Sequence, residues 1–414
     1  MRDAITKIAV EGFKSIASRQ EIEIRPLTIL AGANSSGKSS IMQPLLMLKQ
    51  TLEAPYDPGP LKLDGPNVTF TRTDEFLSRV GESPDPRLRI EIATDSLGFD
   101  ATFSRTREPG LDLTEVTYRF MGSSVTLRPE MSLSDLRDAL SNFAPLKQIS
   151  HQQFSIARRR FYLNLKRDEW SPLVPLEYGS EYIEELIHVP GRRGHQGRTY
   201  GQSGTGPRFP GTFDHYVANV ILQWQKNARF DDAGLNRDLQ NIQIAQSILA
   251  HRVSDVAIEL RVGLREGRPY DLDNIADVGF GVSQVLPVLV ALRVAEEGRL
   301  VYLEEPEIHL HPRAQTNLAE ILAGAANRGV RVVAETHSSL LLTAIQTLVA
   351  KGELSPNLVK LHWFQRDPGT GITKVTSADL DENGAFGDWP EDFGDVALRS
   401  EQNYLDAVET KLAR

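Results

Sequence analysis

The stretch from Leu27 to Ser39 reads LTILAGANSSGKS and joins a short apolar run to a glycine-containing turn. Leu27–Ala31 is the kind of continuous apolar segment that forms a buried strand, and Ser39–Leu52 has the apolar spacing of a helix. Between them, Gly32 to Ser39 matches G-x-x-x-x-G-K-[ST] at every fixed position. The sequence therefore predicts a strand, a phosphate-binding loop and a helix in succession, which is a unit of an α/β fold.

The residues of this loop suit the binding of a nucleoside triphosphate. Glycines let backbone N–H groups turn toward phosphates, and the N-terminus of the following helix adds partial positive charge. We expect Lys38 to reach the β- and γ-phosphate oxygens and the Ser39 hydroxyl to bind Mg²⁺. The predicted ligands are thus ATP and Mg²⁺, held by Gly32, Ala33, Asn34, Ser35, Ser36, Gly37, Lys38, Ser39 and Ser40.

A second apolar strand, within Leu300–Pro306 (LVYLEEP), ends in two carboxylates, as a Walker B strand does. We expect Glu304 to hold Mg²⁺, directly or through water, and Glu305 to orient and polarise the attacking water. The first acid of such a strand is usually Asp. Because Glu304 is one methylene longer, direct coordination of the metal stays open.

His337 follows a third predicted strand, Val330–Ala334, in the string AETHSS. Polar residues at the carboxyl ends of neighbouring parallel strands face the same crevice, so His337 is predicted to contact the γ-phosphate or the attacking water. The alternative is that His337 and Ser338 only begin the next helix, with Ser338 or Ser339 as its N-cap.

Four regions follow from the order of these patterns. Strands and helices alternate in the second half, which favours a parallel α/β sheet, whereas short strand patterns between Leu88 and Arg128 favour antiparallel β structure. We expect an N-terminal ATPase lobe, a β-rich and helical insertion, a C-terminal ATPase lobe and an acidic tail, over residues 1–75, 76–190, 191–365 and 366–414.

The composition predicts a soluble, cytoplasmic protein. The 414 residues contain no cysteine and carry a net charge of −9, and no run has the ~18 apolar residues of a membrane span. The negative charge disfavours a nucleic-acid coat. Two basic clusters leave DNA possible, although a solvated face or intramolecular ion pairs are the preferred interpretation: Arg158–Arg160 with Phe161, Tyr162, Lys166 and Arg167, and Arg192, Arg193, Arg198 and Arg208.

The strings GANSSGKS, LEEPEIHLHP and AETHS, in this order, resemble the ABC-type ATPases of the RecF/SMC/OLD group, including bacterial defence-associated ATPases. The resemblance implies an ABC-type head that forms a homodimer or higher homo-oligomer, with two nucleotides sandwiched between copies. Asp277–Gln284 (DVGFGVSQ) occupies the place of the signature motif, so Gly281 and Ser283 are expected to contact the partner's nucleotide. Gly279 stands where the family has Ser, and whether Ser283 replaces it stays open.

The resemblance also suggests roles for residues outside these strings. Glu307, His309 and His311 match a segment that lies at the dimer interface of the family, although the alternating histidines also allow a metal site. Lys14 is the candidate for adenine contact and Gln50 one candidate for the Q-loop glutamine. For Arg192 and Arg193, the alternative to a solvated face or an ion pair is a position near the nucleotide or at the dimer interface.

Three functions fit this resemblance. The first is an ATPase that acts as sensor or motor for a protein effector, a nuclease or toxin, in anti-phage defence. The second is a DNA-binding ATPase of repair or recombination, and the third is the ATPase head of an OLD-like nuclease. Only about 50 residues follow Gln365, less than a usual domain, so we expect no Toprim nuclease in this chain. The DWPEDF segment, 388–393, is interpreted as a docking segment.

Overall fold

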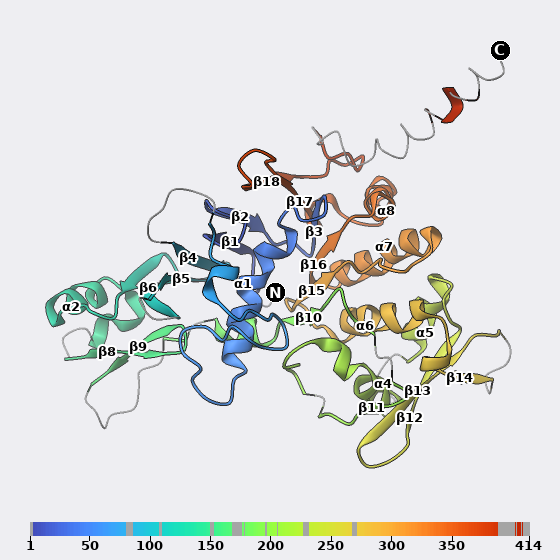
Figure 1. Ribbon diagram of the computed structural model, residues 1–414, viewed down its shortest axis with the longest axis horizontal. Coiled ribbons are helices and arrows are strands. Elements are labelled where there is room, and N and C mark those ends of the chain that lie inside the picture. The colour runs from blue at the N-terminus through green and yellow to red at the C-terminus, as the bar shows by residue number, and fades with distance from the viewer. Residues whose placement is uncertain are drawn as a thin grey trace.

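A computed structural model describes residues 3–79, 86–106, 110–149, 153–167, 176–177, 179–194, 197–204, 206–226, 232–266, 271–387, 402, 404–406 and 408. Within these residues the chain forms two six-stranded sheets, a smaller four-stranded sheet and a two-stranded hairpin, with helices between them (Figure 1).

The phosphate-loop strand lies inside a mainly parallel sheet. The strand order is β10-β15-β16-β3-β17-β18, in which β18 alone runs antiparallel to its neighbour. β16 therefore lies between β15, which carries the two carboxylates, and β3, which leads into the loop. The strand bounds are β3 Leu27–Gly32, β10 Ile187–Val189, β15 Leu300–Glu304, β16 Arg331–Thr336, β17 Val359–Arg366 and β18 Thr373–Ala378.

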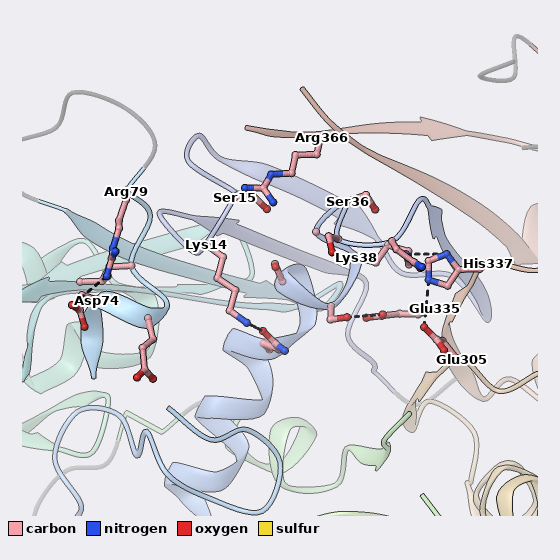
Figure 2. A pocket seen from close by; sticks show the side chains of 18 residues that line it. Lys14, Ser15, Ser36, Lys38, Asp74, Arg79, Glu305, Glu335, His337 and Arg366 are labelled. Carbon is pink, nitrogen blue, oxygen red and sulfur yellow. Dashed lines mark hydrogen bonds and ion pairs between the residues drawn. The ribbon is translucent and has the colours of Figure 1, made fainter. Parts of the chain in front are cut away.

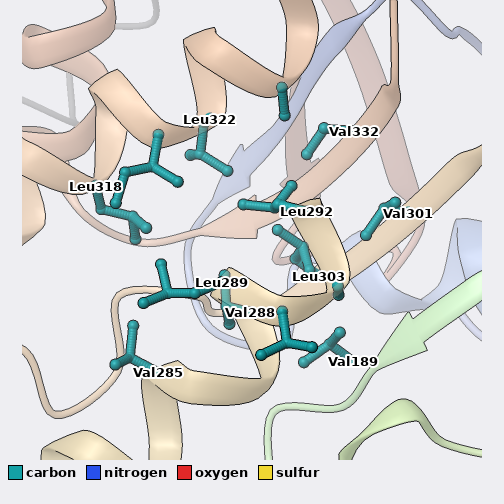
Figure 3. Packing of buried hydrophobic residues seen from close by; sticks show 14 of the residues in the cluster. Val189, Val285, Val288, Leu289, Leu292, Val301, Leu303, Leu318, Leu322 and Val332 are labelled. Atoms are coloured by element: carbon teal, nitrogen blue, oxygen red, sulfur yellow. The ribbon is translucent and has the colours of Figure 1, made fainter. Parts of the chain in front are cut away.

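Helices cover both faces of this sheet, which explains why its central strands are apolar along their whole length. α6 (Phe280–Val294), α7 (Pro312–Asn327) and α8 (Ser339–Ala350) lie on one face, whereas α1 (Lys38–Leu52) lies on the other (Figure 1). Figure 3 shows the first interface, where side chains of α6 and α7 meet the strands: Val288, Leu289, Leu292, Leu318 and Leu322 against Val189, Val301, Leu303 and Val332.

The second six-stranded sheet is antiparallel, with the order β2-β1-β4-β5-β6-β7. Because β1 and β2 precede the phosphate loop and β1 pairs with β4, which lies beyond residue 80, this sheet crosses the boundary predicted at 75/76. The core sheet likewise reaches past 190/191 through β10 and past 365/366 through β18. The elements of this part are β1 Lys7–Glu11, β2 Gln20–Glu23, β4 Arg87–Ala93, β5 Leu97–Arg105, β6 Leu111–Phe120, β7 Ser123–Leu127, α2 Leu133–Ser141, β8 Ser155–Arg159, β9 Tyr162–Lys166 and α3 Ser180–Glu184.

A third layer packs beside α6 and contains one departure from the predicted elements. Leu235–Leu249 has an apolar pattern that predicts a single helix, but the helix ends at Asn241 and Ser247–Arg252 forms a strand. Pairing with Ala257–Gly263 imposes the extended conformation, because every residue of that strand has a partner there. The layer contains β11 Tyr200–Gly201, α4 Val217–Lys226, α5 Asp232–Asn241, β12 Ser247–Arg252, β13 Ala257–Gly263 and β14 Leu272–Asn274.

The observed architecture confirms the predicted α/β fold class, with the phosphate-loop strand inside a mainly parallel sheet and with β-rich additions. Across the described part of the chain, no helix has the length and apolar character needed to cross a membrane.

Candidate functional site: a nucleotide site at the β3–α1 loop

Two glycines let the loop after β3 curl tightly against the neighbouring strands. Gly32 has φ +149°, and a Cβ on it would lie 2.3 Å from the Phe364 carbonyl oxygen. Gly37 has φ +103°, and a Cβ there would lie 2.6 Å from the Thr373 hydroxyl oxygen. Only glycine fits such positions without displacing backbone or neighbours. Both glycines of the motif are therefore required by the folded geometry.

Lys38 lies at the floor of the loop, and its side chain is folded back onto it. Its ammonium donates hydrogen bonds to the carbonyl oxygens of Gly32 and Ala33, each at 3.0 Å. Burial lowers the pKa of Lys38, an effect that the charges of nearby glutamates oppose. A half-desolvated cation at a helix N-terminus is an electrostatic site for an anion such as phosphate.

Glu305 and His337 stand together above the loop. The His337 Nε2 lies 3.3 Å from a Glu305 carboxylate oxygen, and its Nδ1 lies 3.5 Å from the Lys38 ammonium (Figure 2). Burial and the Lys38 charge lower the pKa of His337, although the Glu305 charge acts against them. Ser338 provides the N-cap of α8, since its hydroxyl accepts from the Leu341 N–H at 3.1 Å. The capping role thus falls to Ser338, and His337 faces the loop.

Arg193 holds the carboxyl end of β15 in place. Its guanidinium donates to the carbonyl oxygens of Glu304 at 2.6 Å and Glu305 at 2.9 Å, and its Nε donates to that of Gln284 in α6 at 2.7 Å. Burial lowers the pKa of Arg193 to about 10, so it stays charged at neutral pH. Glu305 has φ +43°, a conformation that a non-glycine residue keeps only when its surroundings enforce it. Arg193 helps to enforce this conformation, because it binds the Glu305 carbonyl oxygen.

Glu304, predicted to hold the metal, does not line the cavity and is bound on the side of its strand that faces β10. One carboxylate oxygen lies 3.1 Å from the His188 Nε2, and the other accepts from the Gly191 N–H at 2.8 Å. Although burial acts against it, these bonds hold the pKa of Glu304 below its ordinary value.

The carboxylate that contacts Ser39 is instead Glu335, near the end of β16. The Ser39 hydroxyl donates to it at 2.8 Å, and the Tyr302 hydroxyl donates to its other oxygen. Burial raises the pKa of Glu335 to about 7, and the neighbouring Glu304 charge adds to this. Glu335 was not among the residues predicted for the site. The available signal was its position two residues before His337 on a buried strand.

These groups line an open cavity of about 990 Å³, large enough for a nucleotide (Figure 2). The phosphate loop, Glu305, Glu335 and His337 form one end. At the other end the Lys14 ammonium donates to Gln43 in α1 at 2.7 Å and lies 4.9 Å from the centre of the Phe70 ring. The remaining lining residues at this end and along the rim are Ser15, Asp74, Glu75, Leu77, Arg79 and Arg366.

Two of the candidates from the family pattern lie in different surroundings. Lys14 lines the cavity, whereas Gln50 does not. Gln50 is buried at the far end of α1, where its amide donates to the Lys62 carbonyl at 2.7 Å and accepts from the Val68 N–H at 3.1 Å. Gln50 therefore shapes the loop that follows α1.

The signature-like segment begins α6 and is separate from the cavity. Gly279 is the N-cap residue and is exposed, and Phe280 is 51% exposed. Gly281 is partly exposed, whereas Ser283 is 6% exposed and its hydroxyl donates to the Phe280 carbonyl at 2.9 Å. The exposed surface at this helix start thus comes from Gly279, Phe280 and Gly281, while Ser283 faces the protein interior.

The segment after β15 connects the site to this helix start. The Glu307 carboxylate is buried and accepts from the Thr336 hydroxyl at 2.5 Å and the His337 N–H at 3.1 Å, so it holds the His337 backbone. His309 packs its ring against Phe280, with centroids 5.6 Å apart. His311 caps α7 through a bond from the Arg313 N–H. No group of three metal-ligating side chains occurs in the described ranges, so the metal alternative for the histidines has no support.

The basic clusters are largely satisfied within the protein. Phe161 and Tyr162 are fully buried and cannot stack on bases. The arginines pair with carboxylates: Arg158 with Asp57, Arg159 with Glu177, Arg198 with Asp277 and Arg208 with Glu184. Arg192 is exposed. The DWPEDF segment lies outside the described residues.

The family model described as "AAA domain, putative AbiEii toxin, Type IV TA system" matches residues 27–343, which include the loop, both carboxylate strands and His337. The chain belongs to this family. Its sequence is also 22% identical over 377 residues to the Old nuclease of Escherichia phage P2, a match that covers 82% of this chain. The chain spans only 57% of the length of that relative. The predicted membership in the RecF/SMC/OLD group of ATPases is thereby confirmed.

Solved structures of SMC head domains are also similar to this chain, at a lower sequence identity. An SMC head bound to the C-terminal winged-helix domain of ScpA aligns with a TM-score of 0.48 and 12% identity, over 92% of this chain and 98% of that one. The SMC head domain from Thermotoga maritima aligns with a TM-score of 0.41 and 12% identity, over 91% and 100%.

Proposed function

We propose that this protein binds ATP with Mg²⁺ at the β3–α1 loop and hydrolyses it. The observation that carries the proposal is the pairing of Glu305 with His337, 3.3 Å apart, in the same cavity as a phosphate loop whose lysine is buried. Glu305 accepts a proton from the attacking water and orients it. His337, held by Glu307 through its backbone, donates a hydrogen bond to the γ-phosphate.

The oxygen donors at the start of α1 fit a magnesium ion. Mg²⁺ prefers oxygen ligands and keeps several waters, taking one or two protein groups plus substrate phosphates. Ser39 and a buried carboxylate supply such donors, and Mg²⁺ would neutralise charge on the phosphates. ATP turnover that requires Mg²⁺ and Glu305 tests the proposal. Equal turnover by wild type and Glu305→Gln would refute it.

We further propose that two copies close head to tail over two nucleotides. The phosphate loop lines the cavity, and the exposed start of the 15-residue helix α6, with Gly279 and Gly281, presents a helix N-terminus, whose partial positive charge suits a phosphate. ATP-dependent dimerisation of Glu305→Gln, measured by sedimentation, tests this arrangement. A variant that binds ATP and stays monomeric at all concentrations would contradict it.

The closing and opening of such a dimer would serve as a signal to a protein effector, a nuclease or toxin, in anti-phage defence. The description of the family and the similarity to a phage nuclease support this role over direct DNA processing, as does the internal pairing of the arginine clusters. Plaque assays with the gene and its neighbours, with Lys38→Ala as the inactive control, test the role. Steeply salt-dependent binding of the purified chain to bare DNA would favour the DNA-binding alternative instead.

A further inference from the structure

The end of the core sheet holds two buried glutamates side by side, on neighbouring strands. Glu304 and Glu335 are register partners of β15 and β16, and Glu335 is in turn the register partner of Leu30 in β3. Register partners project from the same face of a sheet. Both carboxylates therefore point toward the face that α1 covers, but Glu335 is one strand closer to the phosphate loop.

The hydrogen bonds of the two glutamates differ in direction. Both oxygens of Glu304 are occupied on the side of β10, by His188 and by the Gly191 N–H. His188 is itself held, with its Nδ1 3.0 Å from the Asn67 Oδ1 and its ring stacked on Tyr302. This network retains Glu304 at a distance from the loop and keeps it ionised.

Glu335 is oriented the opposite way. It lines the nucleotide cavity, as Glu304 does not, and the Ser39 hydroxyl donates to it at 2.8 Å (Figure 2). Its second oxygen accepts a hydrogen bond from the hydroxyl of Tyr302 on β15, which fixes the position of the side chain. The carboxylate is 3% exposed and has a fixed direction, toward the first turn of α1.

We propose that Glu335, and not the strand-end acid Glu304, is the protein carboxylate that binds the nucleotide-associated Mg²⁺ together with Ser39, and that Glu304 is a positioning residue for the end of β15. This inference rests on the proposed ATP site. The Ser39 hydroxyl and a Glu335 carboxylate oxygen lie 2.8 Å apart in the lining of the cavity, so these two oxygens would hold the ion, and the ion would neutralise charge on the phosphates.

The test separates binding of the metal from binding of the nucleotide. The affinity of the full chain for a fluorescent ATP analogue is measured once with EDTA and once with Mg²⁺, and the ratio of the two reports the metal. Glu335→Gln should keep its affinity in EDTA and lose the Mg²⁺ enhancement by about 10- to 100-fold or more, since loss of even an outer hydrogen-bond partner of a metal ligand costs about that much. Glu304→Gln, the matched control, should keep the enhancement within roughly 3-fold.

A direct readout uses Mn²⁺ as the metal. Electron paramagnetic resonance follows free Mn²⁺ during titration of the chain loaded with a non-hydrolysable ATP analogue. Ser39→Ala and Glu335→Gln should each weaken Mn²⁺ binding, and the double variant should be little worse than either, because both act on one ion. Glu335→Asp keeps the charge and should retain part of the affinity, which covers the case in which Glu335→Gln does not fold.

The outcomes are distinct. Loss of the metal effect in Glu304→Gln with its retention in Glu335→Gln would overturn the assignment, and so would equal losses in both. Absence of ATP binding by the wild type, or wild-type ATP binding by Lys38→Ala, would instead refute the nucleotide site itself.

Discussion

The phosphate end of the cavity and the start of α6 differ in how far their side chains are paired within the chain. At the phosphate end every charged group has a partner: Lys38 binds loop carbonyls, Glu335 binds Ser39, and Glu305 meets His337. At the start of α6, Phe280 and the flanking glycines face outward. One copy of the chain thus brings together the residues of the proposed ATP site, whereas we propose that the exposed helix start binds a second copy. The predictions below test this division in order of decreasing effect.

Glu305→Gln should slow ATP hydrolysis by roughly 10²- to 10³-fold, because it removes the base that accepts the proton from water. ATP binding should persist, since the amide keeps the shape of the side chain. Single-turnover rates beside equilibrium nucleotide binding check both parts. A rate within about 2-fold of wild type would show that Glu305 is not the catalytic base.

Lys38→Ala should weaken ATP binding by about 100-fold, because charge-assisted bonds to phosphate oxygens are lost at a partly buried position. Calorimetric titration measures the affinity. Lys14→Ala is the comparison at the other end of the cavity and should have a smaller effect. If the two variants bind ATP equally well, the phosphate end is not the main source of affinity.

Arg193→Lys tests the connection between the two regions, since Arg193 bridges the end of β15 and α6. Lysine keeps the charge but not the planar fork, so hydrolysis should fall about 10-fold while the affinity for ATP stays near that of wild type. Steady-state rates and thermal melting together give the readout. Unchanged hydrolysis would show that Arg193 does not position Glu305.

Phe280→Ala should weaken ATP-dependent dimerisation by about 10-fold and leave nucleotide binding by the monomer unchanged, because an exposed aromatic residue at an interface carries much of the binding energy. Leu133→Ala is the matched control, since Leu133 is 57% exposed and begins α2, in the part of the chain far from α6 (Figure 1). Sedimentation of both variants in the Glu305→Gln background decides the matter. If Phe280→Ala and Leu133→Ala dimerise equally well, Phe280 at the start of α6 does not lie in the interface.

Acid should lower the stability of the folded chain through His362, which lies on β17, the neighbour of β3 in the core sheet. Burial lowers the pKa of His362 on β17 to about 4, so the unfolded chain binds this proton more tightly than the folded one, and stability falls as pH drops from 6.5 to about 4. The full effect is roughly 3 kcal/mol. Denaturant unfolding of His362→Gln should show a smaller loss over this range, whereas the exposed His251→Gln should behave like wild type.

The predicted elements were correct where a local pattern matched the tertiary environment. Leu27–Gly32 and Lys38–Leu52 formed as expected because an apolar run and a helical spacing were both satisfied by burial. The helix predicted over Leu235–Leu249 was wrong beyond Asn241, because Ser247–Leu249 belongs to β12, where pairing with β13 overrode a helix-like pattern. The extended conformation comes from pairing with the strand that follows directly, Ala257–Gly263, which a helical pattern in Leu235–Leu249 alone does not include.

The sequence by itself determined the phosphate loop, the Glu305 and His337 candidates and the family, because these depend on residue type and spacing along the chain. Only the tertiary structure decided which glutamate meets Ser39. β16 comes after β15 in the chain but lies between β15 and β3 in the sheet. That strand order brings Glu335 to the loop and leaves Glu304 with His188, because lateral distance across a sheet is set by hydrogen-bonded neighbours and not by position in the sequence.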